Sequence, residues 1–152
     1  GYSLIRKVFT VNSQNLARHF SELGTTLGEA LLMPTKIYVK PILSLLEQVT
    51  VKSIAHITGG GFYENIPRAL KKGLSAQIEK KDVKVLPIFD LVAKTGNIPE
   101  HDMFNTFNMG VGMMVCVAQE DADKALETLR AAREDAYVLG TLVSSDEGVI
   151  LK

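Results

Sequence analysis

Residues 55–68 read Ala-His-Ile-Thr-Gly-Gly-Gly-Phe-Tyr-Glu-Asn-Ile-Pro-Arg, and the interpretation of the chain starts from this run. Residues 51–58 predict a strand that leads directly into the glycines, and the spacing of apolar residues over 64–70 predicts a helix. Three consecutive glycines let a backbone come close to a ligand. The N-terminus of a following helix offers free N–H groups and a positive dipole end, which favour phosphate.

Several side chains of this run are candidates for chemistry. The phosphate cradle would consist of Gly59, Gly60 and Gly61, with a hydroxyl from Thr58 and a bidentate guanidinium from Arg68. His56 lies one strand period before Thr58 and could act as a general acid or base, or hydrogen-bond a substrate. A purely structural turn and a half-buried histidine remain open alternatives. The run is neither a Walker loop nor a dinucleotide fingerprint, because GK[ST] and GxGxxG are both missing.

A second unusual run, residues 106–112, reads Thr-Phe-Asn-Met-Gly-Val-Gly. It places polar Thr106 and Asn108 just before an apolar stretch, 111–118, which predicts a central strand covered on both faces. The glycines, Gly110 among them, would allow close backbone approach, and a bulge or tight packing is the alternative.

The remaining pattern mixes helices with strands. Helices are expected over 2–11, 27–32, 88–94, 99–107 and 122–129, and Pro41 is expected to be the first residue of another. That helix should turn Ile42, Leu45, Leu46 and Val49 inward. Residues 12–26 look like a surface excursion, while strands are expected over 74–80, 136–144 and 148–151. We therefore predict an α+β fold, a mixed sheet with helices packed on it.

Composition restricts the possible functions. The chain has 152 residues, of which 46% are hydrophobic and 22% charged, as expected for one globular domain. Seventeen basic and seventeen acidic residues give no general attraction to nucleic acid or to a membrane. A single cysteine, Cys116, suits a reducing compartment. No metal site is predicted, because His19 and His101 have no partner at ligand spacing and no acidic cluster suits magnesium-nucleotide.

Four runs together carry a resemblance: residues 1–6, 34–40, 55–68 and 106–113. They closely resemble the AIR synthetase family, the phosphoribosylformylglycinamidine cyclo-ligases, in that family's order. The resemblance extends from Gly1 to the final strands and implies a C-terminal domain of the three-layer α/β/α type, with a mixed sheet that is partly ferredoxin-like.

The resemblance also implies a second, N-terminal domain that supplies most ATP and Mg²⁺ ligands and forms a homodimer. The chain opens on Gly1 without an initiator methionine, inside the family's Ser-Asn-Gly-Tyr-Ser motif. We therefore expect that domain to be absent from residues 1–152, and this piece alone to be inactive.

The implied activity is a step of purine biosynthesis in the cytoplasm, with formylglycinamidine ribonucleotide and ATP as partners and no nucleic acid or membrane. Residue by residue, the resemblance implies that His56, Asn65 and Asn108 take part in catalysis or orient substrate. It implies that the anion or substrate is bound by Thr58, Gly59, Gly60, Gly61, Arg68, Thr106 and Gly110. Which phosphate the glycines hold stays open.

The sequence differs from the family pattern at positions where an arginine would be expected to contact phosphate. Lys36 stands where an arginine is usual, which keeps the charge but loses the guanidinium fork, and Asn105 also replaces a common arginine. Selenophosphate synthetase and thiamine-monophosphate kinase share this type of domain and are alternatives, as is an anion-binding module without catalysis. Residues 64–68, Glu-Asn-Ile-Pro-Arg, favour the cyclo-ligase.

Overall fold

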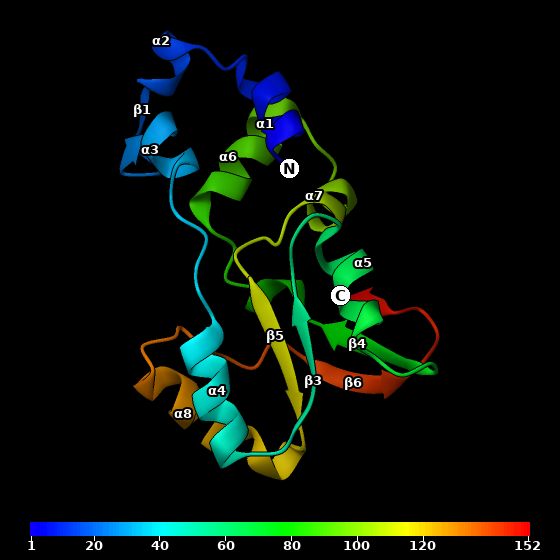
Figure 1. Ribbon diagram of the computed structural model, residues 1–152. Helices are drawn as coiled ribbons and strands as arrows, with labels where there is room; N and C mark the ends of the chain where they lie inside the picture. The colour runs from blue at the N-terminus through cyan, green and yellow to red at the C-terminus, as the bar shows by residue number, and fades with distance from the viewer.

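The computed structural model describes residues 1–152 as an elongated molecule (Figure 1). The N-terminal helices and α6 lie at one end, and a pair of helices, α4 and α8, lies at the other. The helices are α1 (Tyr2–Phe9), α2 (Ser13–Leu16), α3 (Leu27–Leu31), α4 (Val39–Gln48), α5 (Gly61–Arg68), α6 (Pro87–Gly96), α7 (Glu100–Thr106) and α8 (Ala122–Ala131), with 3₁₀ turns η1 (Lys80–Asp82) and η2 (Gln119–Asp121). None of them combines the length and the apolar character that a membrane crossing requires.

The strands divide among three small sheets. β1 (His19–Phe20) and β2 (Thr25–Thr26) form a short antiparallel hairpin, and β3 (Val51–His56) pairs antiparallel with β5 (Met113–Val117). In the third sheet, β4 (Leu74–Ile78) lies between β6 (Thr141–Ser144), which is antiparallel to it, and β7 (Val149–Leu151), which is parallel. The α+β class and the mixed sheet are confirmed.

The main core contains 17 buried hydrophobic residues and holds together α1, α5, α6, α7 and β4. Helix α1 contributes Ile5 and Phe9, which are four residues apart and so lie on one face. Phe62 of α5 meets Phe104 of α7 edge to face at 5.1 Å between ring centroids. This contact joins the helix after the glycines to the helix before the second run.

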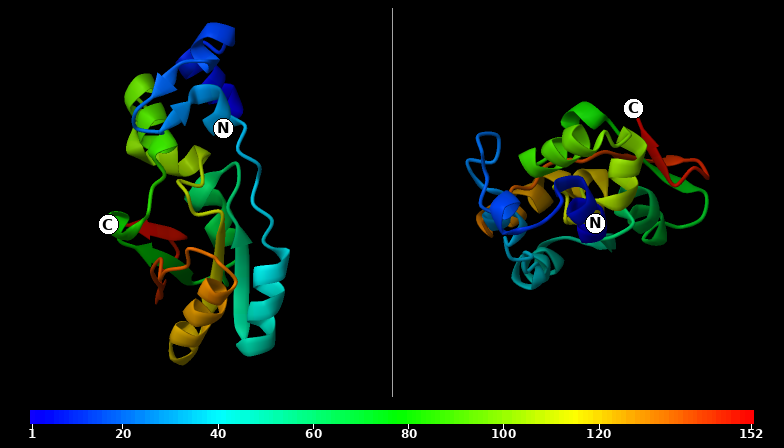
Figure 2. Two further views of the ribbon diagram at one scale, coloured as in Figure 1. Left: turned by 90° about the vertical axis from the view of Figure 1, so that its left-hand side faces the viewer. Right: turned by 90° about the horizontal axis from the view of Figure 1, so that it is seen from above.

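A smaller core lies under the helix pair. Leu45 of α4, Val49 directly after that helix and Ala125 of α8 are buried against one face of the β3–β5 ladder. The view onto α4 and α8 shows both helices in front of the two strands (Figure 2, left). Val115 and Val117 of β5 pack on this side, whereas Met114 packs against the main core.

The expectation that residues 111–118 form a central strand is wrong, whereas the expectation that both faces are covered is confirmed. Strand β5 pairs only with β3, and all five of its residues are half-buried. Its side chains are apolar because one face meets the helix pair and the other meets the main core.

Four further expectations need correction. Helix α4 begins at Val39, so Pro41 is its third residue, where a missing N–H is still harmless. Leu46 of the same helix is 49% exposed. Residues 12–26 carry α2 and the β1–β2 hairpin, and residues 136–140 form no strand.

Candidate functional site

The three consecutive glycines occupy three different environments between β3 and α5. A β-carbon on Gly61 would lie 2.0 Å from the carbonyl oxygen of Phe104, and φ there is +56°. On Gly60, where φ is +102°, it would lie 2.8 Å from the Glu64 carboxylate. On Gly59 it would meet nothing within 4 Å, and φ is not left-handed. The fold therefore requires glycine at 60 and 61, but not at 59.

Backbone donors of this loop are left unused. Helix α5 closes its first turn through a hydrogen bond from the Glu64 N–H to the Gly60 carbonyl, at 3.1 Å. The N–H groups of Gly59, Gly60 and Tyr63 donate no hydrogen bond within the protein. Such donors at a helix N-terminus suit an anion.

Asn65 fastens the loop from within. Its Oδ1 accepts a hydrogen bond of 2.7 Å from the Thr58 N–H, and its Nδ2 faces the Gly59 carbonyl at 3.5 Å. Asn65 is 8% exposed. Its carboxamide is therefore directed at the loop backbone, while the Thr58 residue is exposed.

Arg68 is not part of the glycine loop. It ends α5, about 10 Å along the helix axis from Gly61 at 1.5 Å per residue. Its Nη2 lies 2.9 Å from Oε2 of Glu64 in an ion pair whose side chains are 70% and 51% exposed. The same Glu64 carboxylate lies over Gly60. Arg68 therefore reaches the loop only through Glu64, whose negative charge it offsets.

The second run forms a tight turn before β5. Oδ1 of Asn108 accepts a hydrogen bond of 3.0 Å from the Gly110 N–H, and its carbonyl accepts one of 2.8 Å from Val111. Met109 is buried with φ of 52°, a left-handed conformation unusual for methionine. Gly110 has φ of 102°, and a β-carbon there would lie 2.9 Å from the Lys84 carbonyl. Thr106, the last residue of α7, is half-buried.

The fold brings these two runs together into one candidate site. The Ile57 N–H donates a hydrogen bond of 2.9 Å to the Gly112 carbonyl, and His56 lies opposite Met113 in the β3–β5 ladder. On the α7 side, Gly61 lies against Phe104 and Phe107. Exposed His56, Thr58 and Gly59 thus share a surface with the second run.

Sequence reasoning missed one residue of this surface, Tyr38. Its ring lies 5.8 Å from that of His56, with an interplanar angle of 66°, an edge-to-face contact. Burial raises the pKa of the Tyr38 hydroxyl above its ordinary value, Lys36 opposes this and Glu134 adds to it. The signal was present in residues 34–40, one of the four runs that carry the resemblance.

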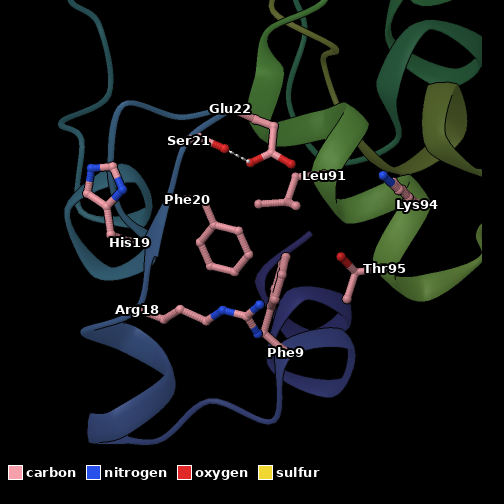
Figure 3. Close-up of a pocket in the computed structure, with 9 residues that line it drawn as sticks. All are labelled: Phe9, Arg18, His19, Phe20, Ser21, Glu22, Leu91, Lys94 and Thr95. Carbon is pink, nitrogen blue, oxygen red and sulfur yellow. Dashed lines mark hydrogen bonds between the residues drawn. The ribbon is translucent and has the colours of Figure 1, made fainter.

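A separate hollow of about 560 Å³ lies near the N-terminal end of the molecule, between β1 and α6 (Figure 3). Phe9 and Phe20 form its apolar wall, and Arg18 lies over the Phe20 ring at 4.9 Å. The lining also holds Glu22, whose pKa is lowered by backbone and Ser21 hydrogen bonds and by Lys94. Charges of both signs meet here, and none of the predicted site residues lines this hollow.

Comparison with known proteins gives a consistent result over the whole chain. Residues 1–152 match the family described as "AIR synthase related protein, C-terminal domain". Proteins named phosphoribosylformylglycinamidine cyclo-ligase are similar: the one from Caldicellulosiruptor bescii is 52% identical over 154 residues, covering 100% of this chain and 45% of that protein. The one from Agathobacter rectalis is 49% identical over 152 residues, covering 99% and 45%. The one from Acetivibrio thermocellus is 50% identical over 149 residues, covering 98% and 44%.

The chain therefore spans less than half the length of these relatives. Identity close to one half across the whole chain indicates the same fold in the part that is shared.

Proposed function

The chain belongs to the family of AIR synthase related proteins, whose C-terminal domain its 152 residues match, and from this we propose that it works within an ATP-dependent cyclo-ligase of purine biosynthesis. The proposed substrate is formylglycinamidine ribonucleotide and the product aminoimidazole ribonucleotide. The relatives that carry the cyclo-ligase name support this, because they are about half identical to this chain along its whole length.

In the proposed reaction, the formyl oxygen attacks the γ-phosphorus of ATP and ADP leaves. A nitrogen of the substrate then attacks the activated carbon, the imidazole ring closes, and phosphate leaves with the former formyl oxygen. Negative charge develops on phosphoryl oxygens at both stages, so N–H donors fixed in advance at that position accelerate the reaction. The unused donors of Gly59 and Gly60 are suited to this role.

The environment of Gly59 is the observation that supports a ligand-binding role for the loop. Neither backbone conformation nor packing requires glycine at this position. A missing side chain at an exposed position is explained if a ligand comes close to the backbone there. We propose that this ligand is a phosphate of ATP or of the substrate.

The side chains take roles that follow from their positions. We propose that His56, exposed at the end of β3, handles a proton. Asn65 and Asn108 would act through the turns that they close, and Thr58 and Thr106 would contact substrate. Arg68 would act by offsetting the charge of Glu64, so that phosphate is not repelled from the loop.

The substitution Gly59→Ala in the full-length enzyme tests the loop. We expect kcat/KM to fall by about 10²-fold, the loss typical of a removed donor for developing negative charge, because a methyl group would hold phosphate away from the N–H groups. The unfolding midpoint should not change, since a β-carbon fits at this position. Wild-type kinetics in a folded Gly59→Ala variant would make the loop structural. Lys72→Ala, an exposed change without a partner, is the control.

The activity itself is tested by assaying the full-length protein for ATP-dependent formation of aminoimidazole ribonucleotide. If selenide or thiamine phosphate is turned over instead, the protein is another member of the superfamily.

Further parts of the proposal concern the whole protein. We propose that the Mg²⁺ that accompanies ATP is bound mainly by residues of an N-terminal domain that is not part of residues 1–152. We also propose that the full-length enzyme is a cytoplasmic homodimer and that residues 1–152 alone are inactive. Turnover by the 152-residue piece would contradict the last point.

A further inference from the structure

We infer that Tyr38 is a positioning residue for His56, and that the Tyr38 hydroxyl packs against Gly112. This deepens the proposed function, and it rests on that function only for its kinetic readout. The inference joins three separate stretches of sequence, 34–40, 55–61 and 106–113, at one point of the fold.

Gly112 is in close contact with the side chain of Tyr38. A β-carbon there would lie 1.8 Å from the hydroxyl oxygen of Tyr38, 2.9 Å from Cζ and 3.5 Å from Cε2. These are its three nearest neighbours, so the obstacle is the Tyr38 side chain alone. The φ of Gly112 is not left-handed, and the backbone would accept another residue. A side chain at 112 would therefore have to displace the Tyr38 ring.

Tyr38 also contacts His56. Tyr38 and His56 meet edge to face, and this arrangement is favourable beyond simple burial. The hydrogen bond from Ile57 to Gly112 fixes the distance between the end of β3 and the segment on which the hydroxyl rests. The phenol therefore has its hydroxyl against Gly112 and its ring against the His56 imidazole, at the point where this hydrogen bond joins the two segments.

The segment before Tyr38 contributes little to holding this side chain in place. Residues 33–37 are exposed and have no regular secondary structure, yet Tyr38 is half-buried. An ion pair between Lys36 and Glu134 ties this segment to the loop after α8. The Tyr38 hydroxyl forms no hydrogen bond, so ring packing and the Gly112 surface locate the side chain. A ring held in this way restricts the rotamers that His56 can adopt.

The test is a double-mutant cycle in the full-length protein, with Gly112→Ala, Tyr38→Phe and the two combined. The methyl group of Gly112→Ala must displace the tyrosine ring, so we expect the His56 imidazole resonances to shift. We expect kcat to fall by about 10²-fold, the effect of a misplacement near 1 Å, while KM changes little. Removing the hydroxyl takes away the atom at 1.8 Å and leaves Cζ at 2.9 Å, so the double variant should recover part of both kcat and the His56 resonances relative to Gly112→Ala.

The outcomes separate the possibilities. His56 resonances that stay in place in a folded Gly112→Ala variant overturn the inference, and so does a double variant no better than Gly112→Ala. A lower unfolding midpoint with unchanged kcat would make Tyr38 a packing residue only, which also overturns it. The His56 resonances report the position of the imidazole, whichever reaction the enzyme catalyses. If they shift and recover while no aminoimidazole ribonucleotide is formed, the proposed function fails and the positioning stands.

Discussion

The hydroxyl of Ser75 holds the turn that connects β6 and β7. Ser75 is fully buried in β4, where it donates a hydrogen bond of 3.0 Å to the Ser145 carbonyl and accepts one of 2.9 Å from the Gly148 N–H. One small side chain thus pairs two backbone groups of the loop that crosses the end of β4.

The substitution Ser75→Ala should lower the free energy of unfolding by about 1–3 kcal/mol, because both backbone groups lose a partner in a partly buried place. Urea denaturation followed by circular dichroism measures this. Ser144→Ala is the control, since Ser144 is exposed and its side chain forms no hydrogen bond. Equal effects of the two changes would show that the buried hydroxyl is not special.

Of the predicted site residues, His56, Thr58 and the glycines lie close together, but Arg68 lies at the far end of α5 and pairs with Glu64. Three adjacent glycines look alike in a sequence, and only their neighbours separate Gly60 and Gly61 from Gly59. Asn65 and Arg68 looked equally like ligand contacts. The structure shows that Asn65 accepts a hydrogen bond from the Thr58 N–H and that Arg68 forms an ion pair with Glu64. Residue spacing in the sequence does not predict either partner.

Among the elements, α3 shows how a short helix is held at its start. The Thr26 hydroxyl accepts a hydrogen bond from the Glu29 N–H, while the Glu29 carboxylate accepts one from the Thr26 N–H, a capping box. The carboxylate also accepts from the Thr25 hydroxyl. These hydrogen bonds, the one from Thr25 foremost, lower the pKa of Glu29 from 4.5 to about 2.

The stability contributed by Glu29 should therefore depend on pH. Its pKa is lower in the folded state than in the unfolded state, so the contribution is complete above 4.5 and is lost as pH falls towards about 2. In Glu29→Gln this acid dependence should be weaker, and the difference between wild type and variant should shrink from pH 6 to pH 2. Thermal unfolding across that range measures it. Glu127→Gln, an exposed change on α8, should leave the wild-type dependence intact.

Elements were predicted best where period and capping signals are local. The helices over 2–9, 27–31 and 122–131 were anticipated from their apolar spacing. The position of β5 was not, because an apolar run shows that a strand is covered but not whether other strands or helices cover it. The arrangement of β6 and β7 on opposite edges of β4 depends on pairing over some 70 residues, which no local pattern reveals.

The whole molecule contains two cores of unequal size. The main one has 17 buried residues, and the smaller one, under α4 and α8, has three. The β3–β5 ladder lies between them and carries the His56 end of the candidate site. The stability of the helix pair therefore bears on the site, because α4 follows directly after Tyr38.

The substitution Leu45→Ala tests whether the helix pair opens as a separate unit. Leu45 is fully buried, and its truncation should cost about 2–5 kcal/mol in the free energy of opening of this part. Hydrogen exchange should then accelerate in α4 and α8 while α5, α6 and α7 keep their protection. Leu46→Ala, on the exposed side of the same helix, should have little effect. Equal acceleration along the whole chain would mean that both cores unfold together.

The contact between Tyr38 and Gly112 has a consequence for the history of the family. A residue larger than glycine at 112 has to displace the Tyr38 ring, and a smaller side chain at 38 lowers that cost. The effect of a change at either position therefore depends on the residue at the other. A lineage that keeps the tyrosine favours glycine at a position that its own backbone conformation leaves free.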